Sequence, residues 1–460
     1  MDKKNIVFEF LSKFFSQLNE NKVTYCILRN YDNLPEAVGN DLDIWVKDGD
    51  QREFQKVLFE TSKNLGWDII KYSRSLNCHG EGNYPYFIVK NGPVLSIIHI
   101  DCWVSIHWRA LTYVNEKIFP ECLLFHKQGF YIPSPGIEAS INLLKDLLYH
   151  GEVREKYNAR IIEYSNRDPE GFLKALERPF GKKIAEFILS MAKAGEWGKL
   201  GKNRNFLRWM LFRKALFNEP FLQLKRWNIY FYGQMKKFLF PNRGLFLALI
   251  GPDGSGKTTM AKAILQSKAA KKIFQKKLYF HGHFPFLPEL KKIVWSLKLS
   301  DKKSQIIPIR NSIDNSKPFG FFRSMIYPIY YGLNYFLGHL LVWKEKAIGS
   351  LIVFDRYFYD YFVQKPYLRC PRWLLSVISK IIPKPDIIIY LKNSPEIIHR
   401  RKSELDQREI ERQTREYEQI AKRFPDGFIV ETSSNPESVV EKIQYIIIQK
   451  IKEKQWKYKP

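Results

Sequence analysis

The chain has 460 residues, more than one compact core normally holds, so two or three domains are expected. Its 45% hydrophobic and 26% charged residues are ordinary for a globular protein and exclude global disorder. The formal net charge of +27 favours an anionic partner, such as nucleic acid, an acidic membrane surface or a phosphorylated glycan, with a merely solvated basic surface as the alternative.

The N-terminus and the cysteines indicate where the protein works. Met1–Asn5 leads into an amphipathic helix pattern and lacks the apolar core and cleavage site of a signal peptide. The five cysteines are scattered, odd in number and without a C-x-x-C pair, so we expect a reducing compartment and no zinc site. They are Cys26, Cys78, Cys102, Cys122 and Cys370. These features predict a cytoplasmic protein, with a peripheral place at the inner face of the membrane left open.

Residues 1 to about 130 mix short strand-like and helical runs, which indicates an α+β domain. Asp41 and Asp43 alternate with apolar residues, which places both carboxylates on one strand face about 7 Å apart. Asp101 lies in a second strand-like run, Ile98–Trp103. Three carboxylates on adjacent strands can hold two Mg²⁺ ions and a triphosphate. Strands are expected at Thr24–Leu28, Leu42–Val46 and Val94–Trp103, and helices at Ile6–Leu18 and Arg52–Leu65.

This pattern resembles the minimal nucleotidyltransferase fold of the polymerase-β kind, over about Lys22 to Val104. The resemblance implies Mg²⁺-dependent nucleotidyl transfer, with Asp41, Asp43 and Asp101 as metal ligands. That family places a Gly-Ser or Gly-Gly pair before its first Asp, where this chain has Leu28-Arg29-Asn30. Two interpretations therefore stay open: an active second site, or a retained scaffold that orients the acceptor.

The segment from 131 to 240 is predicted to be a basic and aromatic helical connector. Pro133, Pro135 and Gly136 mark its beginning, and Pro241–Gly244 marks its end. Between residues 197 and 237, Lys and Arg alternate with Trp, Phe and Tyr. This composition suits an anionic membrane surface. It also suits stacking on nucleic acid or an amphipathic linker that packs on a neighbouring domain.

A glycine-rich run opens the third domain, residues 241–460. The run Gly251-Pro252-Asp253-Gly254-Ser255-Gly256-Lys257-Thr258, followed by Thr259, fits the G-x-x-x-x-G-K-[ST] phosphate loop in full. A buried strand, Leu245–Ile250, precedes it, and a helix is expected from Thr258 to Gln266. Its backbone N–H groups can cradle phosphates, Lys257 can reach the β- and γ-phosphates, and Thr258 can ligate Mg²⁺. The run predicts ATP and Mg²⁺ as cofactors.

Further candidate residues follow a second apolar strand, which ends in Asp355-Arg356-Tyr357. An Asp at this place can hold Mg²⁺ in the manner of a Walker B residue, and Arg356 adds a fixed cation. If the acceptor is an alcohol, Asp355 or Asp360 is the candidate base. The uncharged stretch Ser324–Trp343 is long enough to suggest a membrane span, but its Pro and Gly residues and its position favour a helix of this domain.

An Arg-dense segment follows another predicted strand, Pro385–Leu391. It begins at Pro395 and suits a lid that closes over the transferred phosphoryl group, with Arg401 as its candidate catalytic residue. Its basic residues are Arg400, Arg401, Lys402, Arg408, Arg412 and Arg415.

Together, the phosphate loop, the Asp355-Arg356-Tyr357 strand end and the lid resemble the thymidylate kinase family, over about Leu245 to Ile451. The resemblance implies a parallel sheet flanked by helices and ATP-dependent phosphoryl transfer. The Arg-Glu-Pro-Gly-Gly run that shapes the dTMP site in that family is replaced by Leu278–Pro285.

The layout is also similar to a thymidylate-kinase-like group found with bacterial surface-polysaccharide genes. The shared features are Asp360, the lid run Arg401–Leu405, Gln413 and Tyr417. This similarity implies a sugar or glycan acceptor, including a lipid-linked one. A nucleoside monophosphate such as dTMP is the first alternative, and a nucleic-acid-binding regulatory P-loop ATPase is the second.

Overall fold

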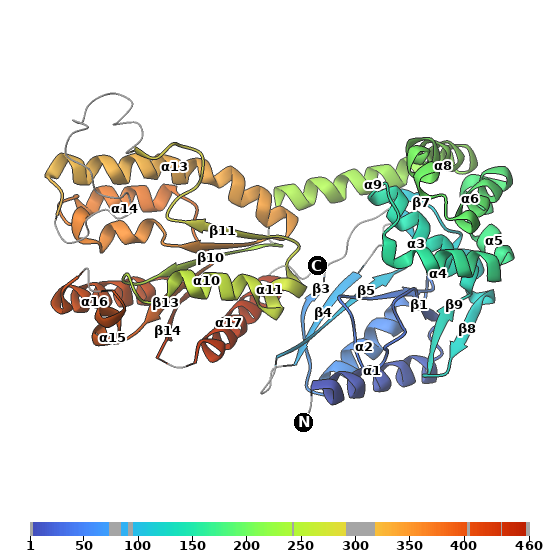
Figure 1. The fold of residues 1–460 in the computed structure, drawn as a ribbon, viewed down its shortest axis with the longest axis horizontal. Coiled ribbons are helices and arrows are strands. Elements are labelled where there is room, and N and C mark those ends of the chain that lie inside the picture. The colour runs from blue at the N-terminus through green and yellow to red at the C-terminus, as the bar shows by residue number, and fades with distance from the viewer. Residues whose placement is uncertain are drawn as a thin grey trace. The chain divides into compact units, whose positions relative to one another are not determined.

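The computed structural model describes residues 3–72, 84–90, 95–241, 243–290, 318–402, 405–433 and 435–456. Two compact units divide the chain: unit 1 ends at Lys236, and unit 2 begins at Lys237. Figure 1 shows the elements of each unit. Cys78 and Ser403–Glu404 lie outside the described residues, whereas Cys26, Cys102, Cys122 and Cys370 are free thiols, as expected.

Unit 1 is built on a mixed five-stranded sheet in the order β1-β2-β5-β4-β3. Strands β2 and β5 are parallel, and the other neighbours are antiparallel. Helices α1 and α2 pack against the sheet through aromatic residues such as Phe14 and Phe54, which join its core. The strands are β1 Tyr25–Ile27, β2 Leu42–Val46, β3 Asp68–Tyr72, β4 Tyr84–Lys90 and β5 Ser96–Trp103, and the helices are α1 Lys3–Glu20 and α2 Gln51–Asn64.

Short hairpins and seven helices complete the described part of unit 1. Proline at the first turn starts α3 and α5, and the Asp168 side chain caps α5 by accepting from the Gly171 N–H. The hairpin strands are β6 His107–Trp108, β7 Leu111–Thr112, β8 Leu123–His126 and β9 Phe130–Pro133. The helices are α3 Pro135–Tyr149, α4 Glu155–Arg167, α5 Pro169–Phe180, α6 Lys182–Ala194, α7 Trp197–Lys202, α8 Arg204–Asn218 and α9 Pro220–Leu239.

The segment expected to be a separate connector instead belongs largely to unit 1. Residues of α3 to α8 form one hydrophobic core with Leu28 next to β1 and Trp45 on β2. The reason is physical: α3 is buried along most of its length, so its apolar face needs the sheet as a partner. The expected boundary near residue 240 matches the start of unit 2 at Lys237.

Unit 2 has a five-stranded sheet in the order β11-β12-β10-β13-β14, and every neighbouring pair is parallel. Apart from Asp355 and Lys392 at the ends of two strands, its central strands are buried runs of apolar residues, as expected for a parallel sheet covered on both faces. The strands are β10 Leu245–Ile250, β11 Lys277–His281, β12 Leu351–Asp355, β13 Ile387–Lys392 and β14 Gly427–Glu431. The predicted strands ending at Ile250, Asp355 and Leu391 are thus confirmed.

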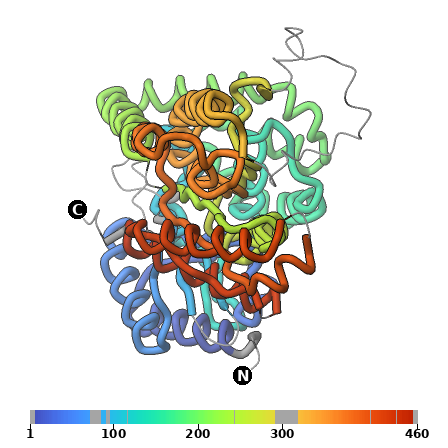
Figure 2. Tube along the Cα trace, turned by 90° about the vertical axis from the view of Figure 1, so that its left-hand side faces the viewer, coloured from blue at the N-terminus to red at the C-terminus, as the bar shows by residue number. Residues whose placement is uncertain are grey.

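Helices cover both faces of this sheet. Helices α13 and α14 lie on one face, and α10 and α17 lie on the other (Figure 1). In Figure 2 the orange α13 and α14 lie on the side opposite to the red C-terminal helix α17. The helices are α10 Lys257–Gln266, α11 Lys268–Ile273, α13 Phe321–Ile348, α14 Arg372–Ile381, α15 Pro395–Arg401, α16 Gln407–Arg423 and α17 Pro436–Trp456.

The stretch Ser324–Trp343 lies within α13 and packs its inner face on the sheet, so the expectation of a domain helix is confirmed. Among the described residues, no helix is both long enough and apolar enough to cross a membrane.

Candidate functional site

The loop between β10 and α10 has the shape of a phosphate cradle. Gly254 and Gly256 have φ values of +93° and +92°, in the left-handed region that favours glycine. A Cβ atom on Gly254 would also lie 3.1 Å from the Ile398 carbonyl oxygen. The turn therefore requires glycine at this position, and it directs the chain into the N-terminus of α10, where the N–H groups and the helix dipole favour an anion.

Lys257 lies at the first position of α10, and its side chain is only 5% exposed. Its Nζ donates hydrogen bonds to the carbonyls of Gly251 at 2.7 Å and Pro252 at 2.8 Å. The ammonium is therefore held against the loop. A cavity of about 550 Å³ opens beside it, and its lining includes Asp253, Gly254, Ser255, Gly256, Lys257, Thr258, Thr259, Arg356, Arg401 and Lys402. Gly251 lies outside this lining and supplies the carbonyl that fixes Lys257.

Three cations surround the carboxylate of Asp253. Arg356 Nη2 lies 2.6 Å from Oδ1, Lys257 Nζ lies 3.6 Å from Oδ1, and Lys402 Nζ lies 3.5 Å from Oδ2. Burial would raise the pKa of Asp253, but these charges lower it to about 2. One small anion thus holds three cations at the edge of the cavity, and a phosphoryl group entering there would compete with Asp253 for them.

Asp355 ends β12, which pairs with β10 on one side and β11 on the other. Its Oδ2 accepts a hydrogen bond from the Thr258 hydroxyl and one from the Tyr279 hydroxyl at 3.2 Å. His281 Nδ1 lies 3.3 Å from the same oxygen. Burial would raise the pKa of Asp355, but the His281 contact and the charge of Lys257 lower it.

The Thr258 and Asp355 pair fits Mg²⁺. A hydroxyl beside an ionised carboxylate is the oxygen donor set that this ion prefers. Within the described residues, the buried Asp355 Oδ1 has no hydrogen-bond partner, so one carboxylate oxygen is free for an ion or for an ion-bound water. Thr258 and Asp355 are the residues that would hold Mg²⁺ in unit 2.

Arg356 adopts a left-handed backbone conformation with φ +67°, unusual for a residue with a side chain. This conformation turns the chain directly after the strand, and the guanidinium pairs with Asp253 on the phosphate loop. Backbone strain that persists at such a position is typical of functional sites.

Asp360 follows on the next turn and is 7% exposed. Burial raises its pKa to about 6, although Lys257 and Arg356 act in the opposite direction. Tyr417 Oη donates a hydrogen bond to Asp360 Oδ1 at 3.0 Å, and Gln364 donates to Oδ2 at 3.3 Å. A carboxyl with a pKa near 6 can accept a proton at neutral pH, as a general base must.

The Arg-dense segment forms two helices, α15 and α16. Arg401 and Lys402 line the cavity, whereas Arg412 pairs with Glu409 and the Val363 carbonyl. Arg400, Arg408 and Arg415 are exposed. Of the basic residues in this segment, Arg401 and Lys402 are therefore the two that line the cavity.

Sequence reasoning missed several residues of this site. Thr432, Ser433 and Val439, which follow β14, complete the cavity wall, and Tyr279 contacts Asp355. Because parallel strands end at one edge of the sheet, the turn after the last strand was a usable signal for Thr432 and Ser433. The contact of Tyr279 with Asp355 depends on the register between β11 and β12, which cannot be inferred from the sequence.

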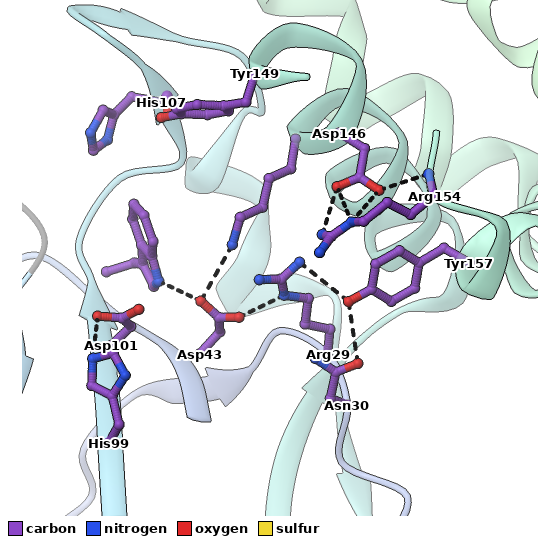
Figure 3. Close-up of polar contacts among 12 residues, drawn as sticks. Arg29, Asn30, Asp43, His99, Asp101, His107, Asp146, Tyr149, Arg154 and Tyr157 are labelled. Carbon is purple, nitrogen blue, oxygen red and sulfur yellow. Dashed lines mark hydrogen bonds and ion pairs between the residues drawn. The ribbon is translucent and has the colours of Figure 1, made fainter. Parts of the chain in front are cut away.

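The three N-terminal aspartates lie together in unit 1, and Figure 3 shows two of them, Asp43 and Asp101. Asp43 on β2 and Asp101 on β5 are directly paired across two parallel strands. One carboxylate oxygen from each of Asp41, Asp43 and Asp101 lies within 4.8 Å of the others. The expected convergence is therefore present, while metal binding there stays a prediction.

Protein cations already occupy one side of this cluster. Arg29 Nε lies 2.6 Å from Asp43 Oδ2, and Lys145 Nζ lies 3.6 Å from Oδ1. Trp103 Nε1 donates a further bond to Oδ1 at 3.0 Å. Burial would raise the pKa of Asp43, but Lys145 and Arg29 keep it below its ordinary value. Arg29 thus neutralises the central aspartate.

The other two aspartates of the cluster lack such strong neutralisation. Burial and the neighbouring Asp43 raise the pKa of Asp41. His99 Nε2 lies 3.2 Å from Asp101 Oδ1. These two carboxylates, with half-buried side chains, are the ligands that a divalent cation could still reach.

Comparisons with known proteins gave one type of match. No protein-family model matches this sequence, and no curated protein matches it. A solved structure of thymidylate kinase from Ehrlichia chaffeensis matches with a TM-score of 0.30 and 14% sequence identity. The match covers 44% of this chain and 98% of that chain. So weak a similarity decides nothing about activity, which has to be inferred from the site.

Proposed function

We propose that unit 2 is an ATP-dependent kinase that transfers the γ-phosphoryl group to a hydroxyl of a sugar or glycan, lipid-linked glycans included. One observation carries the proposal: the glycine-rich loop places Lys257 beside the Thr258 and Asp355 pair at the edge of a cavity. Phosphate, Mg²⁺ and a buried carboxylate can meet there, as phosphoryl transfer requires.

Each residue of the site has a defined task in this proposal. Lys257 and Arg356 bind the phosphate oxygens and balance the negative charge that spreads over them during transfer. Lys402 and Arg401 close the site from the lid and exclude water. Mg²⁺, when bound by Thr258 and Asp355, would neutralise the β- and γ-phosphates.

Asp360 supports an alcohol as the acceptor. In the proposed step, an oxygen of the acceptor attacks the γ-phosphorus. The bond between the γ-phosphorus and the oxygen that bridges the β- and γ-phosphates breaks, and ADP leaves. Asp360 takes the proton of the acceptor hydroxyl. A phosphate acceptor would need no base, so a buried carboxyl with a pKa of about 6 favours the alcohol over a nucleoside monophosphate.

The test is ATP consumption with Mg²⁺ over a panel of acceptors. We expect turnover with sugars or bacterial glycan extracts and little with dTMP, because Leu278–Pro285 replaces the run that shapes a dTMP site. The Lys257→Ala protein serves as the control for contaminating kinases. A kcat on dTMP in the usual range of about 1–100 s⁻¹ would restore the nucleotide kinase alternative.

For unit 1 we propose a nucleotidyltransferase-like scaffold that binds at most one divalent cation. The convergence of three carboxylates supports cation binding, whereas the two protein cations on Asp43 oppose a two-metal arrangement. Mg²⁺ or Mn²⁺ should therefore raise the urea midpoint of unit 1 by mass action. Asp101→Asn should abolish this gain and leave ATP binding by unit 2 intact, and an equal gain in the variant would contradict the proposal.

A further inference from the structure

Helix α13 has two apolar faces, and the sheet covers only one of them. Tyr327, Tyr335 and Val342 on the inner face are buried. The outer face carries seven apolar side chains spaced alternately four and three residues apart, all of them exposed. This spacing places the side chains on one face of the helix, where they form a continuous stripe. They are Phe322, Ile326, Ile329, Leu333, Phe336, Leu340 and Trp343.

Helix α14 and the end of α9 extend this stripe. Trp373, Val377 and Ile381 on α14 are exposed and four residues apart, so they also share one helix face, and Trp373 is 67% exposed. The two helices touch: His339 Nε2 lies 2.9 Å from the Ile381 carbonyl oxygen. Trp343 Nε1 donates a hydrogen bond to the Phe238 carbonyl at 2.6 Å, which brings the exposed end of α9 to the same helix. We call these exposed residues of α13 and α14 the apolar face.

Between positions 318 and 386, all exposed charged side chains are basic. These basic residues lie near the apolar face along the chain, and Arg372 among them pairs with Glu416 on α16. They are Arg323, Lys344, Arg369, Arg372, Lys380 and Lys384. The four acidic residues between positions 318 and 386 are not exposed. They are Glu345, Asp355, Asp360 and Asp386, and each has a hydrogen bond or ion pair within unit 2.

This distribution of charge favours one kind of binding partner for the apolar face. A second copy of the chain in a two-fold contact would bring the same basic rim against itself, with no exposed carboxylate from this segment to pair with it. An anionic lipid surface instead offers hydrocarbon to the aromatic and aliphatic side chains and negative headgroups to the rim. Trp343 and Trp373 are also the kind of side chain that settles at the headgroup level.

We propose that α13 and α14 form a docking face with which unit 2 rests on an anionic membrane. At 28 residues, α13 is about 42 Å long, so lying flat it would present the whole stripe to the interface. The protein would lie on the bilayer without spanning it. The surface differs from the segment 197–237, and it does not depend on the proposed kinase activity.

Flotation of the full chain with vesicles tests the proposal. The wild-type protein should bind vesicles of phosphatidylcholine and phosphatidylglycerol more tightly than vesicles of phosphatidylcholine alone, and added salt should weaken the binding. The triple variant Phe322→Ser, Leu340→Ser and Trp373→Ser should bind the anionic vesicles about tenfold more weakly or worse. These side chains are 78%, 78% and 67% exposed, so the fold should tolerate the changes.

A matched control sits on the other apolar surface. Phe217 and Phe221 are each 85% exposed and lie on α8 and α9 of unit 1. Phe217→Ser with Phe221→Ser removes similar apolar area, yet should leave vesicle binding within about threefold of wild type. A charge-reversal variant, Lys380→Glu with Lys384→Glu, should lose the preference for anionic vesicles without removing an apolar side chain.

Three results would overturn the proposal. One is vesicle binding by the triple variant equal to that of wild type. Another is loss of binding only in the Phe217 and Phe221 variant, which would move the contact to the segment 197–237. The third is a wild-type protein that does not bind vesicles and sediments as a dimer, while the triple variant sediments as a monomer. ATP-dependent stabilisation, measured in parallel, should be the same in all variants.

Discussion

Replacing Lys257 by alanine tests the phosphate site most directly. Its ammonium is held by two carbonyls, at 2.7 and 2.8 Å, and lies 3.6 Å from Asp253. The charge is therefore positioned before any nucleotide arrives. Removing one positioned donor of this kind costs about 10²–10³ in rate, or about 2.7–4 kcal/mol. Asp253 keeps Arg356 and Lys402, so the fold without nucleotide should lose at most about 1 kcal/mol.

The assay can avoid the unidentified acceptor by measuring nucleotide binding. A ligand that binds only the native state at about 100 times its Kd adds about 2.7 kcal/mol to the free energy of unfolding. If Lys257→Ala weakens binding about 100-fold, the same ATP concentration adds only about 0.4 kcal/mol. The ATP-dependent rise in the urea midpoint of unit 2 should therefore nearly disappear.

Lys262→Ala provides the matched control, because Lys262 lies on the same helix and is exposed. This variant should keep the full ATP-dependent shift. Equal shifts in the Lys257→Ala and Lys262→Ala proteins would refute the assignment of the phosphate loop. Acceptor-dependent turnover by Lys257→Ala within about tenfold of wild type would refute it as well.

Two further expectations concern the buried carboxyls. For an alcohol acceptor, kcat/KM should fall as the pH drops below about 6, because Asp360 must be deprotonated to accept the proton. Asp360→Asn should lower turnover about 10²–10⁴-fold and remove this pH dependence, and a wild-type profile with no fall below about pH 6 would contradict the assignment. The second expectation concerns unit 1. Asp43→Asn removes the carboxylate that pairs with both the buried Arg29 and Lys145. That variant should lose about 3–5 kcal/mol in the free energy of unfolding while ATP binding is unchanged, and wild-type stability would refute the ion-pair argument.

The phosphate loop could be predicted because its chemistry is local. Gly254, Gly256, Lys257 and Thr258 are close neighbours in the sequence, and their spacing alone defines the cradle. Asp355 could be placed because parallel strands end at one edge of the sheet. The three cations on Asp253 could not be predicted, since Arg356 and Lys402 arrive from two other elements.

The sequence says less about a segment that is apolar on more than one side. The stretch Ser324–Trp343 is uncharged, so its composition does not distinguish the face that packs on the sheet from the face that is exposed. The helices from Pro135 onward resembled a connector because they are basic and aromatic. Their buried residues join Leu28 and Trp45 in one core, a long-range packing that no local pattern encodes.

Helix α13 links the two proposals through its opposite faces. On the inner side, Tyr335 donates a hydrogen bond to the Gly282 carbonyl, and the Tyr331 ring stacks on His283 at 5.0 Å. Gly282 follows His281, whose ring contacts Asp355, the proposed magnesium ligand. The helix proposed to face lipid on its outer side therefore also supports the loop beside the proposed phosphoryl-transfer site.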